Sequence, residues 1–203
     1  MKIAAVNNIF KKTIGATLLA SALVVATPNL KSQEKDTFEK TQVVSPKGTT
    51  DEIALLWAPD PIIRINGQTH VATIVVDLSK NVLYHYDEFG RPKAAYLVAS
   101  GAKDTPTTKG IRAVTHVESY PYKKAPEQTK RHKNPQNYGP RVICLETVDP
   151  KTGKRGITGE FIHGNNNAAS LGKYVSQGCI RMDNEVIKKL ANEVKRGDFV
   201  LVL

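Results

Sequence analysis

Two residues whose side chains could act together as nucleophile and base lie in the C-terminal part of the chain. His163 follows an apolar, strand-like run, and Cys179 lies sixteen positions later in a turn that contains Gly178. A thiol becomes an effective nucleophile when a neighbouring base or cation favours the thiolate. Residues 165–173 between them are mostly small and polar, which is typical of an exposed loop. We therefore predict that the loop returns on itself and brings the imidazole within hydrogen-bond reach of the thiol.

The alternative is that Cys179 is only a structural residue. An unpaired cysteine is more often a small buried hydrophobe than a nucleophile, and Cys144 fits that description because it lies inside an apolar run. The surroundings of Cys179 are different. Gly178 allows a tight turn or the close approach of a substrate, and Ser176 and Gln177 place a hydroxyl and an amide beside the thiol. These neighbours favour a catalytic role.

The residues around this pair match a known signature. His163-Gly164, followed by Ser-Gln-Gly-Cys-Ile-Arg-Met at residues 176–182, resembles the signature of the L,D-transpeptidase catalytic domain family, also called YkuD-like. The interval between histidine and cysteine fits that signature. There is one departure, because many members carry histidine where this chain has Gln177.

A second block of sequence carries the same resemblance. Residues 74–84 and 98–101 are similar to the opening strands of the family, and Thr-Pro-Thr-Thr-Lys-Gly at residues 105–110 is similar to its Thr-Pro-x-x-x-Gly turn. The two blocks occur in the family's order. The resemblance covers about residues 70 to 203.

The chemistry that these residues predict is nucleophilic acyl transfer. His163 takes the proton from Cys179, and the thiolate attacks a peptide carbonyl to form a thioester. The oxyanion needs donors, for which the backbone N–H groups of Cys179 and of the Gly178 turn are the natural choice, with Ser176 in support and the amide of Gln177 as a third donor. No acidic partner for the imidazole stands out in the sequence.

Two further roles near this pair can be expected, the first from the resemblance and the second from the chemistry of the residue. In the family, the carbonyl that follows the histidine holds the imidazole tautomer, and here that carbonyl belongs to Gly164. Arg181 could bind a substrate carboxylate through both guanidinium arms. A packing and ion-pair role for Arg181 beneath the loop is an equally good interpretation.

The resemblance also implies a substrate. The acyl donor is a tetrapeptide stem of peptidoglycan, the thiolate attacks the carbonyl of its third residue, and the terminal D-alanine leaves. The acyl group passes to an amine on a neighbouring stem or on a wall-attached protein, without a cofactor or metal. With water as acceptor, the protein would be an L,D-carboxypeptidase. The family further implies inactivation by carbapenem-type β-lactams, and nothing in the sequence selects the acceptor.

Three competing interpretations remain open at this point. A metal site could be formed by Cys144, Cys179, His163 and His132, but no pair of them has the spacing of a zinc motif. A structural disulfide between the two cysteines would occupy the nucleophile if the protein is exported to an oxidising compartment. A wall-binding protein that keeps the fold without catalysis is the third interpretation, because Gln177 replaces the histidine.

The charge of the chain bears on its partners. The formal net charge is +10, and 24% of residues are charged, which suits acidic partners such as nucleic acid, anionic lipid or a carboxylate-rich wall polymer. Basic residues are not interleaved with aromatic ones, which make up only 6% of the chain, so we do not expect nucleic-acid binding.

The N-terminal part predicts export. Residues 1–26 combine early lysines with an apolar segment of fourteen residues, 13–26, which is too short to span a bilayer comfortably and is typical of a signal peptide. We expect the periplasm or cell envelope of a bacterium, with no stable membrane span after cleavage. Residues 27–61 are predicted to be a linker or tether, and the catalytic domain occupies residues 62–203.

The pattern within the domain predicts a mainly β fold. Short runs rich in Val, Ile and Tyr recur between turns from residue 62 onward, and Asn66-Gly67 is a strong hairpin signal. This indicates antiparallel strands, and the resemblance implies a β-sandwich of the L,D-transpeptidase catalytic type. Residues 120–139 are irregular, and the resemblance implies a lid there. Apolar residues at helical spacing in residues 184–196 predict one short C-terminal helix.

Overall fold

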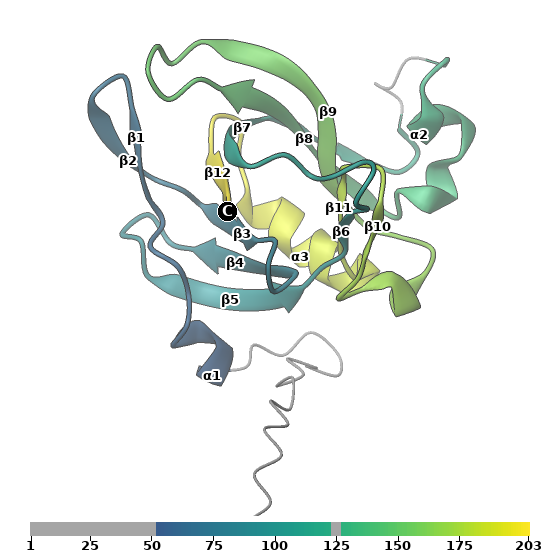
Figure 1. The fold of residues 1–203 in the computed structure, drawn as a ribbon. Helices are drawn as coiled ribbons and strands as arrows, with labels where there is room; N and C mark the ends of the chain where they lie inside the picture. Colours follow the sequence, from purple (N-terminus) through teal and green to yellow (C-terminus); the bar gives the residue numbers. More distant parts are fainter. Residues whose placement is uncertain (1–51, 123–126) are drawn as a thin grey trace, which may run out of the picture. The chain divides into compact units, whose positions relative to one another are not determined.

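The computed structural model describes residues 52–122 and 127–203. Strands dominate this part of the chain (Figure 1). The helices are α1 (Glu52–Leu55), α2 (Lys130–Lys133) and α3 (Asn184–Glu193), with 3-10 turns η1 (Pro135–Asn137) and η2 (Ala168–Ser170). The strands are β1 (Ile62–Ile65), β2 (Gln68–Val71), β3 (Ile74–Asp77), β4 (Val82–Tyr86), β5 (Pro92–Leu97), β6 (Ser100–Gly101), β7 (Gly110–Ser119), β8 (Arg141–Val148), β9 (Arg155–His163), β10 (Tyr174–Ser176), β11 (Ile180–Arg181) and β12 (Phe199–Val202).

Eight strands form one sheet in the order β11-β9-β8-β7-β12-β3-β4-β5. The sheet curls around α3 (Figure 1). Most neighbours are antiparallel, but β11 runs parallel to β9 and β12 runs parallel to β3. The short strands β10 and β6 form a separate parallel pair. The parallel β9–β11 pair matters most for function, because it joins the segment that carries the histidine to the segment that carries the cysteine.

Both faces of the sheet are buried, and alternate residues of the same strand serve different cores. On β3, Ile74 and Val76 pack with the apolar side of α3, whereas Val75 packs with the opposite face. Strand side chains alternate between the two faces of a sheet, so a fully apolar strand requires cover on both sides. The apolar spacing of α3 places Ile187 and Leu190 in the first core, where both are fully buried.

The other face is covered by residues that precede the sheet. The β1–β2 hairpin turns at Asn66-Gly67, both with positive φ, as the hairpin signal predicted. The part of the predicted linker that the structure describes is not extended throughout, because α1 buries Ala54 against this face. Tyr86 also donates a hydrogen bond to the Pro59 carbonyl at 2.5 Å. These contacts fix the chain that enters the domain.

The predicted mainly β class with a short C-terminal helix is confirmed by this architecture. The structure adds the parallel pairings, and it places α2 and η1 within the irregular segment predicted at 120–139. The predicted signal peptide, residues 1–26, lies outside the described residues. Among the residues that are described, no helix has the length and apolar character needed to cross a bilayer.

The N-terminus of α3 gives a stability prediction. The Asp183 carboxylate accepts hydrogen bonds from the backbone N–H groups of Glu185 and Val186 at 2.8 and 3.2 Å. Replacing such a cap with alanine costs about 1 kcal/mol, because N–H groups of the first turn lose their partner. We expect Asp183→Ala to lower the free energy of unfolding by about that amount in urea titrations. Asp183→Asn, which keeps the acceptor, should change it little, and equal losses in both variants would contradict the capping role.

Candidate active site

The register between β9 and β11 brings the cysteine and the histidine to one face. Ile180 pairs with Ile162, and Arg181 pairs with His163. Both isoleucines point into the core, where they are almost completely buried. Since side chains alternate along a strand, the residues that flank them turn the other way. Three residues therefore face a common side of the sheet: His163, Arg181 and Cys179, the last of which directly precedes β11.

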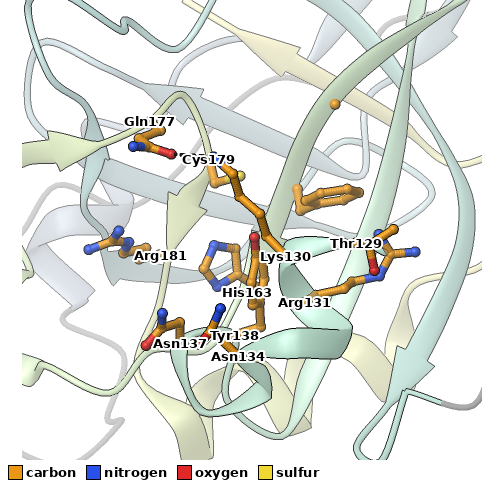
Figure 2. Close-up of a pocket in the computed structure, with 12 residues that line it drawn as sticks. Thr129, Lys130, Arg131, Asn134, Asn137, Tyr138, His163, Gln177, Cys179 and Arg181 are labelled. Carbon is orange, nitrogen blue, oxygen red and sulfur yellow. Dashed lines mark hydrogen bonds between the residues drawn. The ribbon is translucent and has the colours of Figure 1, made fainter. Parts of the chain in front are cut away.

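That side is a pocket of about 640 Å³. Cys179 and His163 both line it, so the structure places the two predicted catalytic residues in one cavity (Figure 2). Its opposite wall comes from the segment that contains α2 and η1, including Lys130 and Tyr138. The segment predicted as a lid therefore contributes directly to the cavity.

The imidazole of His163 is held in one tautomer. Its Nδ1 lies 2.5 Å from the Gly164 carbonyl oxygen, which can only accept, so Nδ1 carries the proton and Nε2 does not. Burial, joined by the charge of Arg181, lowers the pKa of His163 to about 4, although the bond to Gly164 opposes this. The Tyr138 ring packs against the imidazole with centroids 4.7 Å apart. His163 is thus a neutral base at neutral pH.

The Gly164 carbonyl is itself positioned by residues that the sequence did not single out. Asn184 Oδ1 accepts the backbone N–H of Asn165 at 2.9 Å, and the Asn165 side-chain amide donates to the Met182 carbonyl at 2.7 Å. A Cβ on Gly164 would lie 2.3 Å from Asn184 Oδ1, a distance that side chains do not reach. Glycine is therefore required here by close packing.

Cys179 is partly buried, and its thiol is not pre-ionised. Burial raises its pKa; a backbone hydrogen bond from Phe161 and the charges of Arg181 and Lys130 act in the opposite direction without overcoming this effect. The resting pair is therefore a neutral thiol and a neutral imidazole.

The turn before the cysteine depends on Ser176 and Gly178. Gly178 has φ of +101°, which side-chain-bearing residues rarely adopt. Ser176 Oγ accepts the Gly178 N–H at 3.1 Å and donates to the Cys179 carbonyl at 2.5 Å. The Gly178 N–H is therefore committed within the turn, and it is not the oxyanion donor that we predicted. Within the described part of the chain, no hydrogen-bond partner is found for the Cys179 N–H, which remains the backbone candidate.

The Thr-Pro turn at residues 105–110 holds this loop through side-chain hydrogen bonds. Thr107 Oγ1 donates to the Gly178 carbonyl at 2.8 Å and accepts the Gly101 N–H at 2.9 Å. Thr105 Oγ1 donates to the Ser176 carbonyl at 3.0 Å. The two sequence blocks that carried the resemblance are thus in direct contact, and the Thr-Pro turn holds the cysteine loop in place.

A buried ion pair between Arg112 and Glu160 contacts the same turn at Thr108. Glu160 Oε2 accepts from Arg112 Nε and Nη2 at 3.1 and 3.0 Å, and Glu160 Oε1 accepts from the Thr108 N–H and hydroxyl at 2.9 and 2.7 Å. Although both of its carboxylate oxygens are paired, the negative charge of Glu160 acts with burial to raise the pKa of the Cys179 thiol. Our sequence reasoning missed both charged residues, because nothing in a strand sequence shows that two such residues are paired inside the core.

Gln177 takes a different role from the one predicted. Its side chain is exposed, and Oε1 accepts a hydrogen bond from Lys130 Nζ at 3.0 Å (Figure 2). The amide thus directs its oxygen at the cation, whereas an oxyanion donor must direct an N–H at the reacting carbonyl. In this arrangement Lys130 engages the oxygen of the Gln177 amide, and a donor role for its N–H groups stays a prediction.

Arg181 lines the pocket beside His163. Its backbone is fixed by reciprocal hydrogen bonds with Ala99 at 2.8 and 2.9 Å. Among the described residues, no carboxylate forms an ion pair with it, and its Nε has no hydrogen-bond partner. The alternative ion-pair role beneath the loop is therefore not observed, and the guanidinium remains a candidate group for binding an anion.

The competing cysteine and metal interpretations can be compared with the structure. Both cysteines are free, so the predicted disulfide alternative is wrong in this structure. The four residues of the competing metal interpretation do not converge within the described part of the chain; instead, the ligand atoms of His116, Glu118 and Cys144 lie within 4.8 Å of one another. Burial raises the pKa of Cys144 to about 12, so its thiol stays protonated.

The Glu118 carboxylate in that group already has a cationic partner. Arg131 donates to both of its oxygens at 2.9 and 3.0 Å. Burial acts to raise the pKa of Glu118, but the hydrogen bonds from Arg131 and His116 outweigh it and the pKa is lowered. The Arg131 guanidinium also lies 5.1 Å from the centroid of the Phe161 ring. This cluster therefore anchors the α2 segment to the strands beside the pocket.

Comparisons with known proteins identify the family of this chain. The model of the L,D-transpeptidase catalytic domain family matches residues 72–202. The chain is 29% identical over 146 residues to YqjB of Bacillus subtilis (strain 168), a protein named as a candidate L,D-transpeptidase, and this match covers 70% of the chain and 71% of the relative.

One solved structure shares the fold, and a second is similar in sequence. Bd1075 of Bdellovibrio bacteriovorus has a TM-score of 0.51 and 23% identity over 72% of this chain and 53% of its own. A mutant of Enterococcus faecium L,D-transpeptidase, with serine in place of a cysteine, has a TM-score of 0.47 and 25% identity over 65% of this chain and 49% of its own. The chain thus spans about half the length of these two proteins.

The low pKa of His163 gives a prediction about stability and pH. The unfolded histidine gains a proton near pH 6.5, but the folded one does so only near pH 4, so the folded state loses stability as the pH falls through this window. Between pH 7 and pH 5 we expect this group to cost about 2 kcal/mol. Urea titrations of the parent and His163→Gln at both pH values measure it. A loss of equal size in the variant would contradict the buried neutral imidazole.

Proposed function

Because the chain belongs to the L,D-transpeptidase catalytic domain family, we propose that it is a cysteine acyltransferase that acts on peptidoglycan tetrapeptide stems. The family and the fold support an enzyme of this class. The observation that carries the proposal is that one pocket is lined by both Cys179 and a buried His163 whose Nε2 is unprotonated. An acyl-transfer nucleophile needs such a base.

The first half-reaction forms a thioester. As Cys179 Sγ attacks the carbonyl carbon of the third stem residue, its proton moves to His163 Nε2 and the carbonyl oxygen becomes an oxyanion. The Cys179 N–H is the backbone donor that stabilises it. When the intermediate collapses, the C–N bond breaks, the imidazolium gives its proton to the leaving nitrogen, and D-alanine departs.

The second half-reaction regenerates the enzyme. An acceptor amine attacks the thioester carbon, its proton passes to the neutral His163, and the C–S bond breaks with return of a proton to Cys179. The acceptor is an amine on a second stem or on a wall-attached protein. If water attacks instead, the same steps make the enzyme an L,D-carboxypeptidase. Product analysis with and without an added amine distinguishes the two outcomes.

The place of action follows from the substrate. Peptidoglycan stems lie outside the cytoplasmic membrane, so the proposal requires export to the periplasm or cell envelope. The signal-peptide pattern of residues 1–26 supports this requirement. The excess of basic residues, with a formal net charge of +10, favours approach to a wall polymer rich in carboxylates.

Activity of two variants tests the proposal. We expect Cys179→Ala to abolish release of D-alanine from a tetrapeptide muropeptide, and His163→Ala to reduce it by at least about 1000-fold, because each removes one half of the proton-transfer pair. Chromatography of the muropeptide products measures both. Intact turnover by either variant would refute the mechanism. A parent that binds sacculi but releases no D-alanine would instead support the wall-binding alternative.

The packing of Gly164 gives a separate prediction. In Gly164→Ala the new methyl group must displace Asn184, and the carbonyl that holds the His163 tautomer moves with it. A displacement of this kind costs about 100-fold in rate. We expect kcat for D-alanine release to fall by about that factor while the circular dichroism spectrum remains that of the parent. An unchanged kcat would show that the carbonyl does not need this position.

A further inference from the structure

Lys130 is held at the mouth of the pocket by two neighbours. It is the first residue of α2, and the adjacent Arg131 is bound to the buried Glu118 by two hydrogen bonds. At its far end, Lys130 Nζ donates to Gln177 Oε1 at 3.0 Å, across from the cysteine loop (Figure 2). A long flexible side chain is therefore fixed at both its base and its tip.

The charge of Lys130 is not neutralised. Gln177 is a neutral partner, and among the described residues no carboxylate pairs with Lys130. The pocket is lined by three cationic side chains and by no carboxylate. Arg131 is committed to Glu118, so Lys130 and Arg181 supply the net positive charge of the cavity.

An ammonium group has three N–H donors, and Gln177 occupies one of them. The other two are available to a ligand at the pocket mouth. The glutamine oxygen orients the ammonium without cancelling its charge, which a carboxylate at the same place would do. In this chain Gln177, at a position where many family members carry histidine, therefore binds a lysine from the opposite wall of the pocket.

We propose that Lys130, oriented by Gln177, is a specificity-determining residue that binds the carboxylate of the amino acid that leaves from the acyl donor. This rests on the proposed function, which makes that residue D-alanine. Its carboxylate is joined to the scissile nitrogen through a single carbon atom, so it enters the pocket beside the Cys179 sulfur. A donor whose terminal carboxylate is converted to an amide loses this contact.

A lysine near a thiol could also act on the thiol itself, so the test must distinguish the two effects. Iodoacetamide and iodoacetate both alkylate the thiolate, and their rates change together if a variant alters only the thiolate fraction. Iodoacetate alone carries a carboxylate next to the reacting carbon. The ratio of the iodoacetate rate to the iodoacetamide rate at Cys179 therefore reports attraction of a carboxylate.

The experiment measures that ratio by mass spectrometry of the Cys179 peptide, which separates it from the buried Cys144. We expect Lys130→Gln to lower the ratio about fivefold at low ionic strength, and Lys130→Arg to retain it. At 1 M salt the difference between parent and variant should disappear. Lys133→Gln is the matched control, because it removes the same charge from an exposed position of α2 that does not line the pocket.

Kinetics with two donor peptides complete the test. In Lys130→Gln we expect KM to rise about fivefold for the peptide with a free terminal carboxylate and to stay constant for its terminal amide. An unchanged alkylation ratio would overturn the proposal, as would an equal slowing of both reagents, which would place the effect on the thiol. The alkylation readout needs no acyl transfer, so it remains decisive even if the parent protein releases no D-alanine.

Discussion

The hydrogen bond from the His163 ring to the Gly164 carbonyl is the interaction on which the rest of the site depends. A neutral imidazole can offer either nitrogen, and this bond places the proton on Nδ1 and leaves Nε2 as the base. A carbonyl performs this task without introducing a negative charge, so the imidazole can stay buried and neutral. The Asn165–Asn184 hydrogen bond and the close packing of Gly164 hold that carbonyl in position.

The fold explains how two distant segments maintain this geometry. The parallel pairing of β9 with β11 sets the histidine and the cysteine on one face, because their neighbours Ile162 and Ile180 are buried in the core on the other. The Thr-Pro turn then holds the cysteine loop through Thr107. Burial keeps both groups neutral at rest, so in the proposed mechanism charge develops only as the proton is transferred. The nearby cations and backbone donors then stabilise the negative charge, and the bond to the Gly164 carbonyl stabilises the imidazolium.

Much of this could be predicted from the sequence, because the signals were local. The spacing of His163 and Cys179, the glycine of the turn and the apolar period of the last helix each depend on short stretches of chain. The residues that were missed, such as Glu160, Asn184 and Lys130, act through partners on other elements. The Gly178 N–H, which we expected to be an oxyanion donor, is instead bound by Ser176, and the oxygen of Gln177 is bound by Lys130. Neither contact is visible in the local sequence.

The most direct measurement is incubation of the protein with a carbapenem, followed by intact mass spectrometry and peptide mapping. A strained β-lactam carbonyl is a trap for a nucleophilic thiol that is assisted by a base. The account predicts a single covalent adduct whose mass equals that of the drug, located on Cys179. No adduct after prolonged incubation, or an adduct located on Cys144, would contradict it.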